Sequence, residues 1–577
     1  GRCAREVFPA GSYRSCRRRD CRSYGCSLHR YPAQLTALHR KHLFAAVLFG
    51  VALPVLLQLN TQLNAQAQTV GLKTLPDFYD AVPAAELAGR ITEAMTDEEL
   101  LSQTFMFGWA GQAPTDLLMS WITERSLGSI KIFGWNTDDS VKLAKAISLL
   151  QKKANSTRFR IPLFVATDQE GGWIRHVKGR TSETPGNLAI GASGYPIDAY
   201  YEGFYIAREL SALGINLNFA PTVDLYTNHE SSIIGPRSFG QSPEAAGILA
   251  RAFMQGSKKA GVLTTAKHFP GHGDTALDSH GKLPSIAISK ETFYNRELVP
   301  FQYLIEAEVP AIMTGHLHFP AVSEHGEPAS FSQYLLQTVL RGQLGFKGLV
   351  ITDDMMMHGA IRYAGTIAKA VQLALEAGND IIESSTTPRL YDAFWTENLQ
   401  RMQTNEAFRL RVKDAAYRII ETKLRYFKSG NAVPLYPDVY AIPEKLPDAE
   451  GQAFFLSLAA RAVTVVRGKY IPYTTKTGEK ILLAGSYSAF LQAGLKRFPA
   501  AKTSNLSDGI FTKAAASDTV IFCLANDSSL QVLQQLYKAY PNKRYIIFSC
   551  LSPVFLSGIP EIPTAIALYS YAPVSFT

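Results

Sequence analysis

The sequence predicts an α/β fold: a (β/α)8 barrel of the TIM type followed by a smaller α/β sandwich domain. Three observations predict it. After residue 67, short runs rich in Val, Ile and Leu alternate with helical segments, which is typical of parallel strands covered by helices on both faces. Seven such runs precede residue 385, with Leu100–Phe107 as a candidate eighth. A second series of apolar runs begins near residue 450. A doubly wound sheet is the alternative architecture.

The elements of the expected barrel, at residues 85–430, follow in regular order. Its first helix covers Ala84–Met95, and Thr96 with Glu99 forms a capping box that opens the next helix. The expected strands are Gly128–Phe133, Leu163–Thr167, Asn216–Ala220, Gly261–Ala266, Ala311–Thr314, Gly348–Thr352 and Asp380–Glu383. The helical stretches between them include Asp138–Lys153, Pro243–Ala260, Lys290–Ala307 and Ile367–Ala377.

A proline-rich linker at residues 431–449 separates the barrel from a second α/β domain at residues 450–577. This domain opens with a helix that runs into a strand over Ala459–Val466. Its further strands are Lys480–Ala484, Asp518–Leu524 and Arg544–Ser549. Because the sequence ends within what resembles a strand and a loop, we expect this domain to be incomplete. Cys523 and Cys550 lie in apolar runs, and we expect buried thiols rather than a bridge.

The N-terminal region carries almost all of the net charge. The chain has 577 residues, is 46% hydrophobic and 19% charged, and has a formal net charge of +9, which is a globular composition. Residues 1–42 contain ten Lys and Arg but only two acidic residues, whereas the remaining residues contain 48 basic and 47 acidic residues. The body of the protein is therefore neutral, and we expect no nucleic-acid partner.

Residues 39–67 have the pattern of an export signal. A basic segment, His39–His42, precedes the uncharged run Leu43–Leu57, and Ala65–Ala67 is a small-x-small cleavage site. The apolar run is shorter than the roughly 20 residues that span a bilayer. We therefore expect a secreted or periplasmic protein without a stable membrane span, and an uncleaved N-terminal anchor is the alternative. We interpret residues 1–38 as sequence upstream of the native start, with a small metal-binding or disulfide tail as the alternative.

Polar residues follow five of the expected strands. In a parallel barrel the active site is built from the loops after the strands, so these residues should share one rim. They are Asp168–Gly172, Asp224 with Gly235–Gly240, Lys267–Asp274 with Asp278–His280, Gly315–His318, and Asp353–Asp354.

The residue types at this rim suit a sugar substrate. Asp353 and Asp354 are adjacent on an extended chain, so only one of them can face the barrel axis. Asp278 and His280 are spaced so that the carboxylate can hold the imidazole and raise its pKa, which gives an acid/base near neutrality. Lys267, Arg237 and Asp168 supply donors and an acceptor for hydroxyl groups. His316 and His318 form the one metal-like pattern, and a metal-dependent hydrolase similar to the amidohydrolases is an alternative.

The same motifs resemble those of glycoside hydrolase family three, in its β-N-acetylglucosaminidase branch. The sequence K-H-F-P-G-H-G-D-T at Lys267–Thr275, with Asp278-Ser279-His280, resembles the signature of that branch. Four more motifs match the family in the same order: D-Q-E-G-G at 168–172, N-F-A-P-T-V-D at 218–224, R-E-L-V-P-F at 296–301 and I-T-D-D-M at 351–355. The resemblance covers residues 85–430. Residues 450–577 are similar to the family's second domain but shorter.

The resemblance implies a role for each matching residue. Asp353 matches the nucleophile that forms a covalent glycosyl-enzyme intermediate. His280 matches the acid/base, and Asp278 matches the carboxylate paired with it. The positions that hold the non-reducing N-acetylglucosamine are matched by Asp168, Arg237, Lys267 and His268.

One position departs from the family pattern. The family commonly has an arginine eight residues after the aspartate of D-Q-E-G-G, and His176 stands there, directly after Arg175. Either the arginine is shifted by one residue, or a substrate hydrogen bond is remade. Both Arg175 and His176 are therefore candidate substrate-binding residues.

These observations together predict an exo-acting, retaining β-N-acetylglucosaminidase that needs no metal or cofactor. Peptidoglycan fragments and chitin oligomers are the expected substrates. A phosphorolytic enzyme of the same family is one alternative within this class, because a neutral imidazole does not repel phosphate as a carboxylate would. A β-glucosidase of the same family is the other, although the Asp278 and His280 pair argues against it. An inactive glycan-binding barrel is the alternative from another class.

Overall fold

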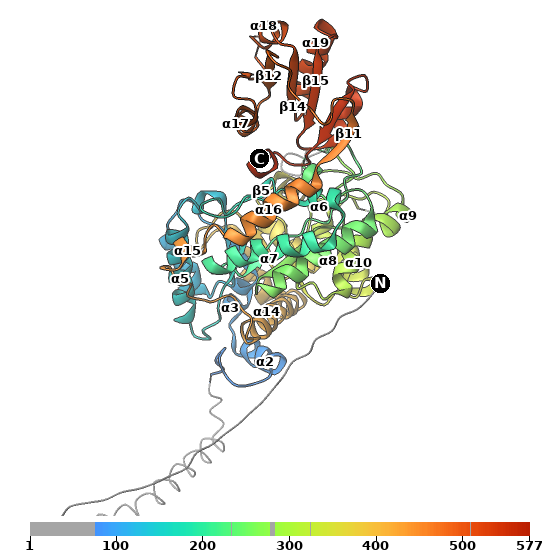
Figure 1. Ribbon diagram of the computed structural model, residues 1–577. Coiled ribbons are helices and arrows are strands. Elements are labelled where there is room, and N and C mark those ends of the chain that lie inside the picture. Colours follow the sequence, from blue (N-terminus) through green and yellow to red (C-terminus); the bar gives the residue numbers. More distant parts are fainter. Residues whose placement is uncertain (1–74, 232, 277–282, 324, 508) are drawn as a thin grey trace, which may run out of the picture. The chain divides into compact units, whose positions relative to one another are not determined.

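Eight parallel strands form the central barrel of the computed structural model (Figure 1), which describes residues 75–231, 233–276, 283–323, 325–507 and 509–577. Leu75–Thr577 form one compact unit. The strands run in the order β10-β1-β2-β3-β6-β7-β8-β9. A parallel bridge between Ile351 and Ile381 links β9 to the segment before β10 and brings the two ends of the sheet together. The strand bounds are β1 (Phe105–Phe107), β2 (Ser129–Ile132), β3 (Phe164–Thr167), β6 (Leu217–Asn218), β7 (Leu263–Phe269), β8 (Ala311–Thr314), β9 (Leu349–Thr352) and β10 (Ile382–Ser384).

Helices cover the outside of this barrel. Several begin at side-chain caps: Asp139 caps α5, and Ser242 caps α8, whose first residue is proline. The helices are α2 (Ala84–Ala94), α3 (Asp97–Gln103), α4 (Asp116–Arg125), α5 (Ser140–Asn155), α6 (Asn187–Ser193), α7 (Pro196–Leu213), α8 (Pro243–Lys259), α9 (Lys290–Thr292), η3 (Phe293–Glu297), α10 (Val299–Glu306), η5 (Tyr334–Gln343), α11 (His358–Ala364), α12 (Ile367–Ala377), α13 (Ala393–Thr404) and α14 (Glu406–Phe427). Short 3-10 turns lie at η1 (Gly134–Asn136), η2 (Gly235–Arg237) and η4 (Ala329–Phe331).

Alternation along the strands divides the barrel core into two layers. Successive side chains of a strand point to opposite faces, so every second residue faces the barrel axis. The inner layer contains Met106, Phe164, Ala166, Leu217, Phe219, Met313, Leu349 and Ile351, together with Ile419 and Tyr426 of α14. In β2, Ile130 and Ile132 belong to the outer layer, so Lys131 between them faces the axis.

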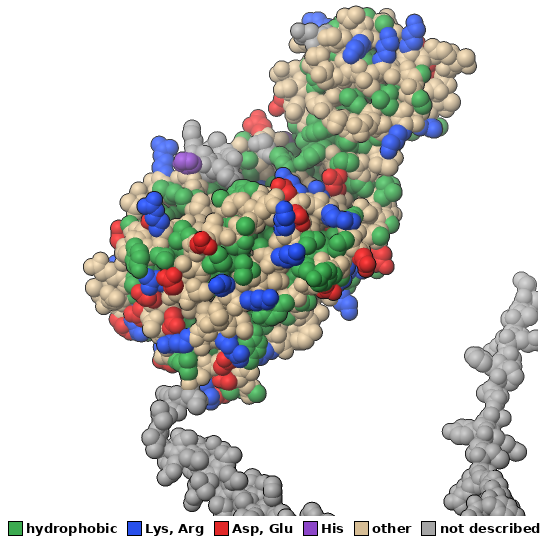
Figure 2. All heavy atoms as spheres, turned by 90° about the vertical axis from the view of Figure 1, so that its left-hand side faces the viewer, with side chains coloured by type: hydrophobic (Ala, Val, Ile, Leu, Met, Phe, Trp, Pro, Cys, Tyr) green, Lys and Arg blue, Asp and Glu red, His purple; other side chains and the backbone are tan. Residues whose placement is uncertain are grey.

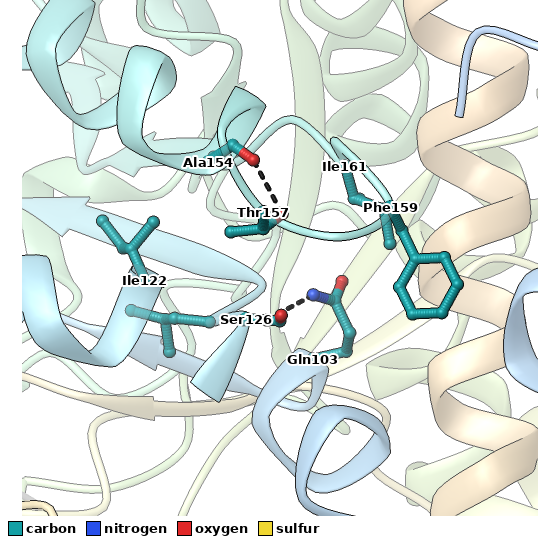
Figure 3. Close-up of a pocket in the computed structure, with 8 residues that line it drawn as sticks. Gln103, Ile122, Ser126, Ala154, Thr157, Phe159 and Ile161 are labelled. Carbon is teal, nitrogen blue, oxygen red and sulfur yellow. Dashed lines mark hydrogen bonds between the residues drawn. The ribbon is translucent and has the colours of Figure 1, made fainter. Parts of the chain in front are cut away.

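Apolar, amide and hydroxyl side chains gather at the N-terminal ends of β1, β2 and β3. A small pocket there is lined by Gln103, Ile122, Ser126, Leu127, Ala154, Thr157, Phe159 and Ile161 (Figure 3). Gln103 donates through Nε2 to the carbonyl oxygen of Ser126 at 2.5 Å, and the Thr157 hydroxyl donates to that of Ala154 at 2.8 Å. Gln103 also accepts from the buried Lys423 of α14 at 3.2 Å. Hydrogen bonds at this end therefore join α3 to α14 and to the loop before β2.

The second α/β domain contains a six-stranded sheet with helices on both faces. Its strand order is β11-β16-β15-β14-β12-β13, in which only β11 is antiparallel to its neighbour. Buried apolar clusters lie on each face, one around Leu482, Phe522 and Tyr545 and one around Leu483, Ile521 and Ile546. The elements are β11 (Thr464–Gly468), β12 (Ile481–Ala484), α17 (Ser488–Arg497), β13 (Lys502–Ser504), α18 (Gly509–Ala515), β14 (Thr519–Leu524), α19 (Asp527–Ala539), β15 (Arg544–Ser549), η6 (Pro553–Gly558), β16 (Thr564–Ala567) and η7 (Pro573–Ser575).

The segment before this sheet is anchored on α7. It contains α15 (Ile442–Lys445) and α16 (Ala449–Ala462). Arg208 of α7 forms ion pairs with Asp448 and Glu450, and Arg461 of α16 pairs with Asp198 of α7. The face of the molecule in Figure 2 carries Lys and Arg interspersed with Asp and Glu, in keeping with the neutral body of the sequence.

The fold class predicted from the sequence is confirmed, and two local expectations need adjustment. Leu100 belongs to α3, because the capping box of Thr96 and Glu99 is formed and starts a helix there, so the eighth strand is only Phe105–Phe107. Strands β13 and β16 are three and four residues long and had not been expected. Cys523 and Cys550 are buried free thiols. No helix among the described residues has both the length and the apolar character to cross a bilayer.

Candidate active site

A chain of alternating charges crosses the barrel at the C-terminal ends of its strands. Lys131 of β2 lies 2.9 Å from Asp168 and 3.0 Å from Glu383 of β10, measured from Nζ to the carboxylate oxygens. Lys267 of β7 lies 2.5 Å from Asp168 and 2.7 Å from Glu170. Each ammonium therefore bridges two carboxylates: Lys131 joins Asp168 to Glu383 of β10, and Lys267 joins Asp168 to Glu170 of the same segment after β3. Because all of these side chains are buried, their positions are fixed before any ligand arrives.

The lysines keep the two central carboxyl groups ionised. Burial would raise the pKa of Asp168, but Lys131 and Lys267 outweigh it and hold the pKa well below its usual value. Burial opposes ionisation of Glu170 in the same way, and Arg237 and Lys267 lower its pKa to about 2. Both groups are therefore acceptors at neutral pH.

Arg237 and His268 extend the network around the barrel. Arg237 donates through Nε and Nη2 to the two oxygens of Glu170, at 2.9 and 2.8 Å, which is a bidentate pair. Its Nη2 also lies 3.4 Å from Nε2 of His268. Nδ1 of His268 lies 2.6 Å from Oδ2 of Asp224, which orients the ring. The structure thus brings together the four predicted sugar-binding residues, Asp168, Arg237, Lys267 and His268.

The two aspartates after β9 have different surroundings. Asp354 accepts hydrogen bonds from the backbone N–H groups of Met356 and Ser385, both at 3.0 Å, so it stabilises the turn. Asp353 instead faces the charged centre. Burial would raise its pKa, but His268, His316 and Lys131 together lower it. An ionised carboxylate at this place can act as a nucleophile or as a base.

Glu383 and Lys131 are the members of the site that sequence reasoning missed. Glu383 is fully buried, and burial raises its pKa well above the usual value, helped by Asp354, Asp353 and Asp168 and opposed by Lys131. Burial therefore opposes ionisation of Glu383, whose carboxyl group lies 3.0 Å from the Lys131 ammonium. A lysine and a glutamate inside otherwise apolar strand segments are the signal that could have identified them, because buried charges are almost always paired.

The loop after β3 separates Arg175 from His176. The hairpin of β4 (Gln169–Gly171) and β5 (Ile174–Arg175) folds back, and the backbone N–H of His176 donates to the carbonyl of Asp168 at 3.0 Å. Nδ1 of His176 then lies 3.6 Å from the Asp168 carboxylate. Arg175 points elsewhere: it donates to the carbonyls of Thr181 and Ser182 and lies 3.5 Å from Glu183. Neighbouring side chains on a strand face opposite ways, so only His176 joins the network.

The two histidines after β8 are held by different partners. Nδ1 of His316 lies 2.8 Å from the hydroxyl of Ser330, and its Nε2 lies 3.2 Å from the carbonyl oxygen of Asp354. Nδ1 of His318 lies 3.4 Å from the hydroxyl of Ser285. Among the residues that the structure describes, no group of three or more His, Cys, Asp or Glu side chains could hold a metal ion. Asp278 and His280 lie outside the described residues, and their roles stay predictions.

The network leaves donors and acceptors free for a polyhydroxylated ligand. An ammonium group has three N–H donors, and Lys131 and Lys267 each lie beside two carboxylates, so each keeps at least one donor beyond these ion pairs. Asp168 is ionised and keeps lone pairs on both oxygens. Neighbouring hydroxyl groups of one sugar ring match this alternation of donor and acceptor, beside the carboxylate of Asp353.

The chain is similar to glycoside hydrolases along most of its barrel. The model described as "Glycosyl hydrolase family 3 N terminal domain" matches residues 96–421. "Beta-hexosaminidase A" of Pseudoalteromonas piscicida is 31% identical over 336 residues, which cover 54% of this chain and 56% of that protein. "Beta-hexosaminidase" of Tolumonas auensis is 38% identical over 260 residues, covering 44% of this chain and 75% of that protein. The chain thus spans little more than half the length of the Pseudoalteromonas relative.

Among solved structures, the chain resembles a glycoside hydrolase family 3 β-N-acetylglucosaminidase from Paenibacillus sp. str. FPU-7. The TM-score is 0.75 and the sequence identity 28%, over 84% of this chain and 95% of that one. The likeness therefore includes the second α/β domain as well as the barrel.

Proposed function

The chain belongs to glycosyl hydrolase family 3, and from this premise we propose that it is an exo-acting, retaining β-N-acetylglucosaminidase. The family membership confirms the resemblance found in the sequence motifs. The names of the two beta-hexosaminidase relatives and of the Paenibacillus enzyme support the choice of an N-acetylated sugar. One observation carries the proposal: a carboxylate, Asp353, stands ionised beside a buried network built to hold hydroxyl groups.

Asp353 is the nucleophile in this proposal. Its carboxylate attacks the anomeric carbon, the bond to the leaving oxygen breaks, and a covalent glycosyl-aspartate forms. Water then attacks the same carbon from the other face, and the carboxylate leaves, so the configuration is retained. The lowered pKa of Asp353 supports this role, because the ionised carboxylate is a far better nucleophile than the protonated acid.

The Asp168 network holds the terminal sugar. Lys131 and Lys267 each offer one donor, and Asp168 offers acceptors, so neighbouring ring hydroxyls fit between them. Because the groups are already paired with one another, they need no reorganisation when the sugar binds. Such preorganisation favours the transition state when the interactions strengthen as positive charge develops on the ring.

His280 donates the proton to the leaving oxygen in this proposal, and Asp278 holds its ring. This assignment rests on the match to the family motif. His280 is left neutral by this donation, and it becomes protonated again when it takes the proton of the attacking water in the second step. Peptidoglycan fragments and chitin oligomers remain the proposed substrates, and an exported location remains the proposed compartment.

The test compares 4-nitrophenyl β-N-acetylglucosaminide with the matching β-glucoside, using the full chain. We expect preference for the N-acetyl substrate, no loss with a chelator and no gain with phosphate. Proton NMR of the first turnovers should show the β-anomer of the released sugar. Preference for the glucoside, faster turnover with phosphate, loss of activity with a chelator, or early release of the α-anomer would each contradict a different part of the proposal.

The neighbouring aspartates provide a matched pair of variants. Asp353→Asn should lower kcat by at least about a thousandfold, because the amide cannot form the glycosyl ester. Asp354→Asn should lose far less, because the remaining amide oxygen can still accept from Met356 and Ser385. Equal losses in both variants would mean that the turn after β9, rather than the Asp353 carboxylate, limits turnover.

A further inference from the structure

A stack of rings leads from Asp168 to the surface of the barrel rim. His176 lies 3.6 Å from the Asp168 carboxylate, and the centre of its ring lies 5.6 Å from that of Phe133. The rings of Phe133 and Trp135 are 4.6 Å apart and nearly parallel, at 8°. The exposed fraction is 7% for Asp168 and 8% for Phe133, the His176 side chain between them is 29% exposed, and Trp135 at the outer end is 50% exposed. We call His176, Phe133 and Trp135 the rim stack.

Trp135 is exposed but firmly oriented. It lies in η1, directly after β2, and its indole Nε1 donates to the carbonyl oxygen of Trp109 at 2.7 Å. The next residue, Asn136, donates to the carbonyls of Trp109 and Gly111 and accepts from the N–H of Phe133 at 2.8 Å. Phe133 covers one face of the indole. The structure therefore fixes a large aromatic surface at the rim while leaving half of it open to solvent.

Such a surface suits the apolar face of a sugar ring. A pyranose carries a patch of C–H groups that packs flat on an indole and gains both burial and dispersion energy. The terminal sugar is not the occupant, because its hydroxyls are matched by the buried charges around Asp168. The ring that lies further out along the substrate is the one that joins through the scissile bond.

We propose that Trp135 binds the sugar of the leaving group, the ring on the reducing side of the scissile bond, by stacking on the open face of its indole. This inference rests on the proposed function and extends it from the terminal sugar to the next ring. The rim stack would then make the enzyme cleave oligosaccharides in preference to glycosides with small leaving groups. His176 connects the two sites, because it touches both Asp168 and Phe133.

The experiment compares two leaving groups in Trp135→Ala and Trp135→Phe. The substrates are N,N′-diacetylchitobiose, whose leaving group is a sugar ring, and methyl β-N-acetylglucosaminide, whose leaving group has none. We expect Trp135→Ala to lower kcat/KM for the disaccharide about tenfold more than for the methyl glycoside. Trp135→Phe should restore most of the difference, since it keeps a ring. Tyr440→Ala removes another exposed aromatic residue, 91% exposed between α14 and α15, and should change neither value.

Two results for Trp135→Ala would overturn the inference. One is an equal loss of kcat/KM on both substrates, which indicates a structural role, and the other is no loss of kcat/KM on the disaccharide. A wild-type protein that cleaves neither glycoside would contradict the proposed function instead. The stack is then tested by titrating Asp353→Asn with the disaccharide and with free N-acetylglucosamine. Adding Trp135→Ala should weaken only the disaccharide, about tenfold in Kd, and an unchanged Kd would refute the stack.

Discussion

Replacing Lys131 by methionine removes the positive charge that links Asp168 to Glu383. Lys131 is buried, and its Nζ lies 2.9 Å from Asp168 and 3.0 Å from Glu383, over the rings of Phe133 and Phe219. Methionine has a similar length and shape, so the change leaves little cavity. What is lost is the cation itself and its remaining donor.

The expected cost follows from what the two carboxyl groups can still do. Breaking a buried ion pair by removing one partner typically costs about 3 to 5 kcal/mol. Here Asp168 keeps Lys267 at 2.5 Å, and the raised pKa of Glu383 lowers the cost of leaving that carboxyl group without Lys131. We therefore expect the lower end, about 3 kcal/mol of unfolding free energy. Loss of one charged hydrogen bond to the sugar should cost about 2 kcal/mol more in the transition state, or about thirtyfold in kcat/KM.

Urea denaturation and kcat/KM on 4-nitrophenyl β-N-acetylglucosaminide measure the two effects separately. Lys423→Met is the matched control: it changes another buried lysine in the same way, at the N-terminal ends of the strands, where Lys423 donates to the carbonyl of Gly128 at 2.7 Å. This control should leave kcat/KM unchanged. A Lys131→Met variant with wild-type kcat/KM would refute the reasoning that Lys131 serves the sugar site.

Two further predictions concern protonation. Glu383→Gln should keep kcat/KM at neutral pH within about threefold, since the amide mimics the protonated acid. Because the folded pKa of Glu383 is raised, the wild-type protein should lose stability as the pH rises above the pKa of the unfolded chain. The urea midpoint of the glutamine variant should fall less over the same pH range. A thirtyfold loss of kcat/KM would instead mean that Glu383 is ionised. Burial lowers the pKa of Lys423 to about 7, below its usual value of 10.5, so the unfolded chain binds the proton between these pH values and stability should rise with pH there. This rise in unfolding free energy, roughly 3 to 4 kcal/mol between pH 7 and pH 10, should be absent in Lys423→Met. The same pH dependence of the unfolding free energy in both proteins, measured by urea denaturation, would contradict the prediction.

The barrel was predictable because its strands are buried on both faces. Strands such as β3 and β9 are buried at every position and contain one polar residue each, a threonine, which distinguishes them from the helices that cover them. The rim residues followed from the rule that loops after parallel strands meet at one end, and Asp168 and Lys267, which come from different parts of the chain, lie 2.5 Å apart there.

The interior of the site was less accessible to sequence reasoning. Lys131 and Glu383 lie within strands, not after them, so a search of the loops passes over them. Their pairing depends on the alternation of side chains in β2 and β10 and on the closure of the barrel between β9 and β10. The roles of Arg175 and His176 likewise depend on the hairpin after β3, whose register decides which of the two side chains faces Asp168.

The most direct test of the account is to trap the glycosyl-enzyme on Asp353. The full chain is mixed with a substrate that has a very good leaving group, such as 2,4-dinitrophenyl β-N-acetylglucosaminide, quenched in acid within the first turnovers, digested and examined by tandem mass spectrometry. The account predicts one N-acetylhexosaminyl group on the peptide that contains Asp353, and none in Asp353→Asn. A sugar attached to another residue, or active enzyme that never carries a sugar, would contradict Asp353 as the nucleophile.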